Sequence, residues 1–256
     1  MAFLNIKGRS VAYRLLGAEA NPLVVLAHPL GMSQAVWDDV LPALLQRYRV
    51  LTWDLPGHGA SQAWGEAAIA PSDLAAEALA LADRAGAERF HFAGTSIGGV
   101  VGQQLIAEHA ERLLSATLTN TGAVIGTAEL WSTRAGRIRE EGLAAMAEEI
   151  VPRWFAPACF EAEPALKAGW CTQMGRGDDD AYARLCEMLG SHAFTGKLSG
   201  KGVKVQLLGG SEDLATPPAT LEALAAELDD APLEILEGVG HVPSVEVPGL
   251  FAEKLL

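Results

Sequence analysis

The sequence predicts an α/β fold with a mostly parallel central sheet that is flanked by helices. Short runs rich in β-branched residues alternate along the chain with longer segments of helical periodicity, which is the order expected when helices cover a parallel sheet. Several of the strand-like runs are apolar on both faces, as buried parallel strands are. The chain of 256 residues is long enough to bury a large core in one domain and still carry an insertion.

The strands are predicted from runs of Val, Ile, Leu, Thr and aromatic residues between turn-forming residues. The first two, 3–8 (FLNIKG) and 10–17 (SVAYRLLG), are expected to pair as an antiparallel hairpin at the edge of the sheet. Six later segments supply the other strands: 22–28, 48–54, 89–95, 113–120, 204–210 and 233–238.

Helices are expected between these strands, where apolar residues recur at helical spacing. The predicted helices are 34–47, 71–86, 96–110 and 216–228, and the segment 248–256 closes the chain as a further helix. Each lies between two predicted strands or after the last one, so the helices can cover both faces of the sheet.

The stretch 121–196 breaks the alternation. It consists of helix-like pieces, carries Trp131, Trp154 and Trp170, and contains no convincing strand. We therefore predict a helical cap at 121–196 that is inserted into an α/β core formed by residues 1–120 and 197–256.

Composition and charge exclude several classes of protein. Half of the residues are hydrophobic, but charged residues interrupt every apolar run well before the ~18 residues that a membrane span needs. The first residues lack the basic start and apolar stretch of an export signal. A net charge of -13 disfavours nucleic acids and anionic membranes as partners. We expect a soluble protein that acts on a small molecule, and the oligomeric state stays open.

Three cysteines, Cys159, Cys171 and Cys186, fall in one region without CxxC spacing. Neither a disulfide framework nor a metal site is predicted from them. A reducing cytoplasm is the simplest setting, and no cofactor is expected.

A Gly-x-Ser-x-Gly sequence occupies residues 94–98, between a predicted strand and a predicted helix. Ser96 could be a small residue that merely fits a tight turn. The context favours a nucleophile, because a sharp strand-to-helix turn strains the serine backbone, needs small residues at Gly94 and Gly98, and lifts the hydroxyl to the carboxyl end of the sheet.

A serine nucleophile requires a base and an orienting carboxylate. Asp213 follows a predicted strand, and His241 lies in a Gly-flanked loop after the last one, which gives the chain order Ser, Asp, His. Asp213 could instead cap the next helix, but Thr216 suits that position better because a proline follows it directly. Glu212 is the competing acid.

Two backbone N–H groups are needed to stabilise the negatively charged oxygen of a tetrahedral intermediate. Ile97, directly after the candidate nucleophile, is one candidate donor. Leu30, in the loop after strand 22–28, is the other, because Pro29 has no N–H to donate.

Together these residues and the turn DLPGHGAS (54–61) resemble the α/β-hydrolase superfamily over essentially the whole chain. A narrower resemblance, to the 3-oxoadipate enol-lactonases, is carried by GTSIGGVVGQ (94–103), by the long segment 118–157 and by GGSEDLATPP (209–218). It implies hydrolysis of a small enol-lactone that carries a carboxylate, in aromatic-acid catabolism, with Ser96, Asp213 and His241 as the triad.

The chain departs from that family at two motifs. PLGM stands where the family has Ser-Leu-Gly-Thr, and DLPGHG stands where it has Asp-Thr-Arg-Gly-His-Gly. The region 170–202 matches only loosely, so the substrate is either the enol-lactone or a relative of it. A C–C bond hydrolase of a ring-fission product, a general carboxylesterase and a non-catalytic ligand-binding homologue stay as alternatives.

The predicted cap gathers arginines beside tryptophans in a chain that is acidic overall. Arg137 and Arg139 lie next to acidic residues and suit the solvated face of a helix. Arg134 is three residues after Trp131, so the two share a helical face. Arginine binds a carboxylate through two parallel hydrogen bonds. We predict an anionic substrate with these binding residues: Trp131, Arg134, Arg153 and Trp154.

Overall fold

A computed structural model describes residues 1–65 and 67–255. Its eight strands are β1 Ala2–Ile6, β2 Arg9–Leu16, β3 Leu23–Ala27, β4 Arg49–Trp53, β5 Phe90–Thr95, β6 Leu113–Thr119, β7 Val205–Gly210 and β8 Leu233–Leu236. They form one sheet in the order β1-β2-β4-β3-β5-β6-β7-β8. The predicted edge hairpin β1–β2 is confirmed, β2 runs antiparallel to β4, and all other neighbours are parallel.

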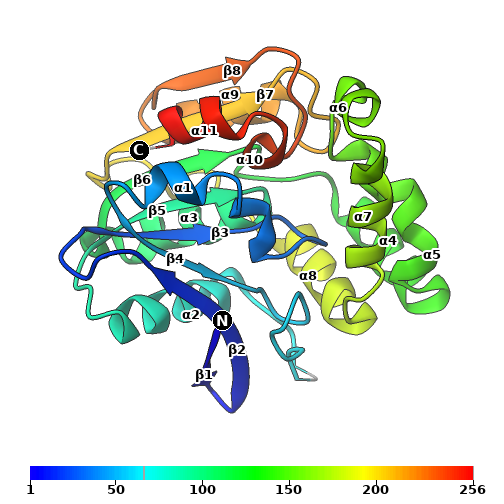
Figure 1. Ribbon diagram of the computed structural model, residues 1–256, viewed down its shortest axis with the longest axis horizontal. Coiled ribbons are helices and arrows are strands. Elements are labelled where there is room, and N and C mark those ends of the chain that lie inside the picture. The colour runs from blue at the N-terminus through cyan, green and yellow to red at the C-terminus, as the bar shows by residue number, and fades with distance from the viewer. Residues whose placement is uncertain (66, 256) are drawn as a thin grey trace.

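The parallel strands are buried on both faces because helices cover them. Every residue of the central strand β3 is buried. The core helices are η1 Gln34–Trp37, α1 Leu41–Leu44, α2 Pro71–Arg84, α3 Ile97–Glu108, η2 Ala110–Arg112, α9 Pro218–Glu227, α10 Pro243–Glu246 and α11 Pro248–Lys254. Figure 1 shows helices on both sides of the sheet, with α1 and α11 together on one of them. The predicted α/β-hydrolase fold is confirmed.

Two predicted helices differ from the observed ones, and proline explains both. The segment 34–47 forms the short 3-10 helix η1 and the single-turn α1. Pro42 has no N–H for the carbonyl of Asp38, so one continuous helix cannot run through this segment. The helix predicted at 216–228 begins at Pro218 and is preceded by Pro217, because proline suits the first turn of a helix, where its missing N–H is not needed.

Residues 121–196, which we call the cap, lie between β6 and β7. Its helices are α4 Ala128–Glu141, α5 Leu143–Ile150, η3 Val151–Arg153, α6 Pro157–Ala162, α7 Ala165–Met174 and α8 Asp179–Ser191. They stand together at one end of the sheet in Figure 1, and α4 packs along α8. The Phe194 N–H donates to the Ala123 carbonyl over 3.0 Å, so the two ends of the cap lie side by side.

Among the described residues, no helix is both long and apolar enough to cross a bilayer.

Candidate active site

Ser96 lies at the turn between β5 and α3 with φ +59° and ψ -119°. This conformation is strained for a residue with a side chain. A Cβ atom at Gly94 would lie 2.2 Å from the Gly98 carbonyl oxygen, and one at Gly98 would lie 2.2 Å from the Ala27 carbonyl oxygen. Both glycines are therefore required by the close approach of backbone to backbone.

Asp213 and His241 are brought together from the loops after β7 and β8. The distance from His241 Nδ1 to Asp213 Oδ2 is 2.8 Å, and both residues are buried. Burial alone would raise the pKa of Asp213, but the attraction of His241 and hydrogen bonds from His241, Thr216 and Asn120 lower it to about 2. Asp213 is thus ionised at neutral pH and orients the imidazole with Nδ1 toward the carboxylate.

Two neighbours of Asp213 that the sequence analysis weighed, Glu212 and Thr216, have different surroundings in the structure. Glu212 is exposed, although it adjoins Asp213 in the chain. The expectation that Thr216 caps the following helix is wrong, because the cap position is Pro217. The Thr216 hydroxyl instead donates to Asp213 Oδ2 over 2.7 Å.

Both predicted N–H donors lie in segments next to the Ser96 turn: Ile97 directly follows Ser96, and Leu30 lies in the loop after β3, which is the neighbour of β5. Ile97 is the first residue of α3, where a helix leaves its N–H groups unpaired. Within the described residues, the N–H groups of Leu30 and Ile97 donate no hydrogen bond, whereas the Gly31 N–H donates to His58 Nε2 over 2.9 Å. Leu30 and Ile97 therefore keep their N–H groups available for an oxyanion.

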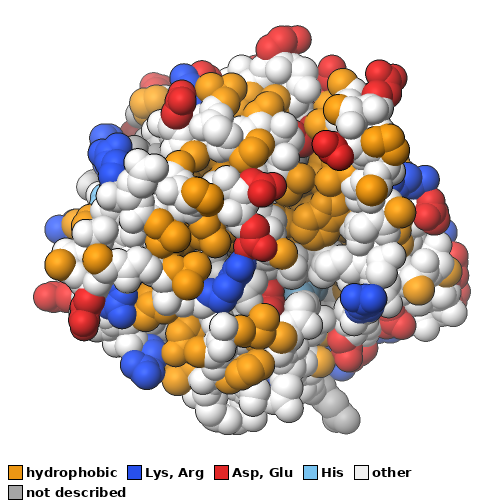
Figure 2. Space-filling model, viewed as in Figure 1, with side chains coloured by type: hydrophobic (Ala, Val, Ile, Leu, Met, Phe, Trp, Pro, Cys, Tyr) orange, Lys and Arg blue, Asp and Glu red, His pale blue; other side chains and the backbone are white. Residues whose placement is uncertain are grey.

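Ser96 opens into a pocket between the core and the cap. The core contributes Ser96, Ala215 and Thr216 to its wall. The cap contributes Ile125, Gly126, Leu130, Trp131, Arg134, Ile150, Arg153 and Trp154. All four predicted substrate-binding residues therefore line the same pocket as Ser96. On the face drawn in Figure 2, hydrophobic side chains also gather in a recess between the core and the cap.

Ser96 Oγ makes no hydrogen bond to the described residues, His241 included. A hydrogen bond between nucleophile and base is often long in a free enzyme and shortens when substrate binds. The site thus provides a strained serine that lines the pocket, a buried His–Asp pair and two N–H groups without a hydrogen-bond partner among the described residues.

Residues 24–254 match the model of the alpha/beta hydrolase family. The chain belongs to this family. It is 29% identical over 242 residues to 3-oxoadipate enol-lactonase 2 of Acinetobacter baylyi, which is 93% of this chain and 89% of that one. The crystal structure of the enol-lactonase from Burkholderia xenovorans LB400 is similar with a TM-score of 0.94 and 31% identity, covering 99% of this chain and 97% of the other.

A hydrolase from Pseudomonas aeruginosa PA01 is also similar, with a TM-score of 0.93 and 30% identity over 98% of this chain and 95% of that one. The resemblance to the α/β hydrolases and the enol-lactonases is confirmed, and the protein is a hydrolase.

Asn120 is a residue of this α/β hydrolase that the sequence did not single out. It follows β6 with φ +48° and is fully buried. Its amide donates to Asp213 Oδ2 over 2.9 Å and to the Gly240 carbonyl over 3.1 Å. Asn120 thereby links the loop that carries Asp213 to the loop that carries His241. A polar residue at the carboxyl end of a parallel strand was the available signal.

His28 and His58 of the hydrolase also escaped prediction as parts of the site. His28 Nε2 accepts from the Leu55 N–H, and His58 Nε2 accepts from the Gly31 N–H, each over 2.9 Å. Burial, with repulsion from His58, lowers the pKa of His28 to about 4, and burial also lowers the pKa of His58. Both imidazoles are neutral at pH 7 and tie the loop with Leu30 to the turn 54–61.

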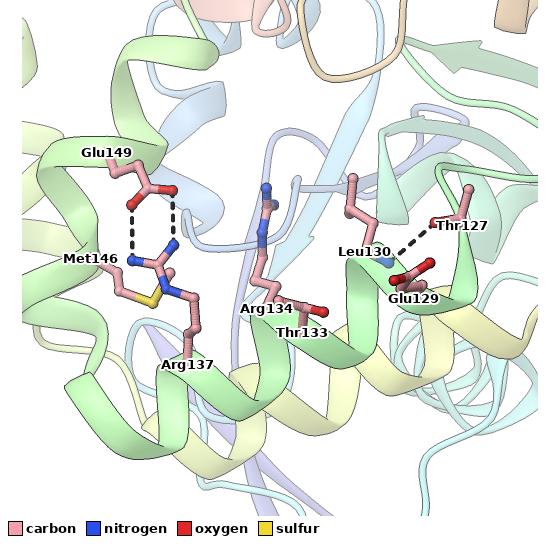
Figure 3. A pocket seen from close by; sticks show the side chains of 8 residues that line it. All are labelled: Thr127, Glu129, Leu130, Thr133, Arg134, Arg137, Met146 and Glu149. Carbon is pink, nitrogen blue, oxygen red and sulfur yellow. Dashed lines mark hydrogen bonds and ion pairs between the residues drawn. The ribbon is translucent and has the colours of Figure 1, made fainter.

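The cap arginines of the hydrolase differ in what they contact. Arg137 pairs with Glu149, and Arg139 pairs with Asp180 and Glu187. Arg134 points away from α4 into the open space between Arg137 and Leu130 (Figure 3). Its guanidinium lies 5.1 Å from the centre of the Trp131 ring and pairs with no carboxylate of the described residues.

Proposed function

We propose that this hydrolase cleaves a small carboxylated lactone or ester, 3-oxoadipate enol-lactone or a related enol-lactone, through an acyl-enzyme on Ser96. One observation carries the proposal: the pocket that contains Ser96 also contains Arg134 and Arg153. A pocket with a nucleophile and two cationic side chains suits an acyl group and an anionic group in one small molecule. The relatives named as enol-lactonases support the same substrate class.

In the proposed acylation step, Ser96 Oγ attacks the carbonyl carbon of the lactone while its proton passes to His241 Nε2. Asp213, ionised and 2.8 Å from His241 Nδ1, stabilises the imidazolium that forms. The N–H groups of Leu30 and Ile97 stabilise the negative oxygen of the tetrahedral intermediate. Its collapse breaks the ring C–O bond, and His241 returns the proton to the oxygen of the leaving enolate. The enol formed in this way tautomerises to the ketone.

In the second step, water replaces the serine. His241 Nε2 accepts a proton from the water molecule, whose oxygen attacks the acyl carbon. The same two N–H groups stabilise the second intermediate. Ser96 leaves with the proton from His241, and the product is a dicarboxylate if the substrate already carried one carboxylate.

Arg134 is the proposed anchor for the carboxylate of the substrate, and Arg153 is the second candidate. An arginine without a carboxylate partner can form two charge-assisted hydrogen bonds to the ligand without first breaking an ion pair. Arg153 donates to the Leu214 carbonyl over 3.0 Å, which leaves part of its guanidinium available. Trp131 and Trp154 supply flat apolar walls for a ring.

A substrate panel tests the proposal. We expect turnover of carboxylated enol-lactones to exceed that of simple lactones, neutral aryl esters and ring-fission diketones. Ser96→Ala should fold normally and lose on the order of 10³-fold or more in kcat/KM. A serine-directed phosphonate should label Ser96, as read by mass spectrometry. Faster turnover of diketones would favour C–C hydrolysis, and an active Ser96→Ala variant would refute the acyl-enzyme.

A further inference from the structure

Glu246 is an acidic residue at the end of α10 for which the proposed chemistry has no use. Its carboxylate accepts hydrogen bonds from the N–H groups of Gly240 and Val242, which flank His241, over 3.0 and 3.2 Å. It also accepts from the N–H of Ala156 in the cap over 2.9 Å. Glu246 pairs with no cation among residues 1–65 and 67–255.

A fourth donor to the same carboxylate comes from the cap. Cys159 Sγ lies 3.2 Å from Glu246 Oε2. Burial, together with the hydrogen bond and charge of Glu246, raises the pKa of Cys159 to about 12, so the thiol keeps its proton and can donate it. Two donors from the cap and two from the His241 loop therefore meet on one side chain.

The backbone at this junction is in direct contact as well. The His241 N–H donates to the carbonyl of Trp154, a residue of the pocket wall, over 2.9 Å. A Cβ atom at Gly240 would lie 2.7 Å from the Ala156 nitrogen, so only glycine lets these two backbone segments come this close. The wall of the pocket and the loop of the candidate base are thus joined.

We propose that Glu246 is a positioning residue that fixes the His241 imidazole relative to the cap wall of the pocket. The proposal rests on the role of His241 in the proposed function. Hydrogen bonds to an ionised acceptor are about twice as strong as neutral ones, so a carboxylate holds these four donors better than an amide would. A glutamine has one acceptor oxygen, and its NH₂ group would face N–H donors.

Glu246→Gln is the test, with Glu253→Gln as the matched control on the exposed side of α11. With a neutral, activated aryl ester, Glu246→Gln should lower kcat by roughly 10- to 100-fold with little change in KM, because a small displacement of a catalytic group is costly. Glu253→Gln should leave both constants unchanged. Thermal unfolding checks that each variant is folded.

A double-mutant cycle separates positioning from a general structural role. In a His241→Ala background, Glu246→Gln should change the residual kcat/KM by no more than about twofold, because the group that it positions is gone. An undiminished loss in that background would overturn the proposal. If His241→Ala alone left activity intact, the proposed function would fail instead, which is a different result.

A second cap variant covers the case in which Glu246→Gln does not fold. Cys159 is half-buried, so Cys159→Ala removes one donor to Glu246 while keeping the carboxylate and the backbone around it. We expect a loss of about 2- to 5-fold in kcat that disappears in the His241→Ala background. Full activity of Cys159→Ala, together with a normal melting temperature, would contradict the link between cap and base.

Discussion

Asp213 in the core and Arg134 in the cap are both charged and lie at the same site, yet they are held differently. Asp213 is buried and accepts hydrogen bonds from Ala215, Thr216, Asn120 and His241. Arg134 is half-buried and pairs with no carboxylate of the described chain. Under the proposed function, the carboxylate that orients the base is thus held by several hydrogen bonds before substrate arrives, whereas the arginine that would bind the substrate carboxylate has no ion-pair partner to release. Changes in the core should affect every substrate, and changes in the cap only some.

The largest effect is expected at the buried carboxylate. Asp213→Asn should lower kcat/KM by about 10³- to 10⁴-fold for charged and neutral substrates alike, because an amide cannot stabilise the imidazolium and favours the wrong tautomer. Glu212→Gln, an exposed neighbour, should stay within about twofold. Steady-state kinetics on two substrates suffice. The opposite ranking would transfer the acid role to Glu212.

The contrast between core and cap can also be tested on stability, with a glycine-to-alanine substitution in each. Gly98→Ala should cost about 3 kcal/mol, because the new Cβ would lie 2.2 Å from the Ala27 oxygen and the backbone has no room to move. Gly136→Ala on α4 meets no atom within 4 Å and should stabilise by about 0.5–1 kcal/mol. Urea denaturation measures both. If both substitutions lowered the free energy of unfolding, α4 of the cap would be packed as tightly at Gly136 as the Ser96 turn is at Gly98.

Lowering the pH should reduce the free energy of unfolding, because the buried imidazole of His28 must then take up a proton. The pKa of His28 is 6.5 when unfolded and about 4 when folded, so its contribution is complete above pH 6.5 and is lost as the pH falls toward 4. The loss amounts to at most about 3 kcal/mol, and His58 adds in the same direction. Asp213 acts lower, between pH 3.8 and about 2.

His28→Gln should therefore flatten the dependence of unfolding free energy on pH between 6.5 and 4, measured by urea denaturation at several pH values. The wild-type chain, measured under the same conditions, gives the reference slope. An unchanged slope in His28→Gln would mean that His28 is not the acid-sensitive group.

The most selective effect on activity is expected in the cap. Arg134→Ala should lower kcat/KM for a carboxylated lactone by roughly 10- to 100-fold, or about 1.5–3 kcal/mol, and leave a neutral aryl ester nearly unchanged. Arg139→Ala, from the same helix but paired with Asp180 and Glu187, should affect neither substrate by more than about twofold. Equal losses on both substrates for Arg134→Ala would assign it to cap structure.

The sequence predicted what depends on short stretches of chain. The strands were predicted because the pattern of apolar residues is local in the chain. The Ser96 turn was predicted because its backbone requires small residues at Gly94 and Gly98. The break in 34–47 was missed because the apolar periodicity there continues past Pro42.

Contacts between residues far apart in the chain could not be predicted from the sequence. Asn120 meets Asp213 across 93 positions, and Ala156 meets Glu246 across 90, so no spacing rule connects them. No sequence pattern singled out His28 and His58, because their contribution depends on the distant N–H groups from which the two rings accept hydrogen bonds. Residues that react carry a recognisable chemical type, whereas residues that hold them in place do not.

The hydrogen bond from the Phe194 N–H to the Ala123 carbonyl holds the two ends of the cap together, so the cap is a segment that can be lengthened or replaced without moving the strands on either side of it. A segment that leaves and returns at one point imposes no tension on the strands, whatever its length. Each doubling of a loop costs only about 0.6 kcal/mol in closure entropy, so insertions or a transplanted cap would burden the sheet little. Diversification of substrate range can therefore proceed in the cap while β6 and β7 keep their register.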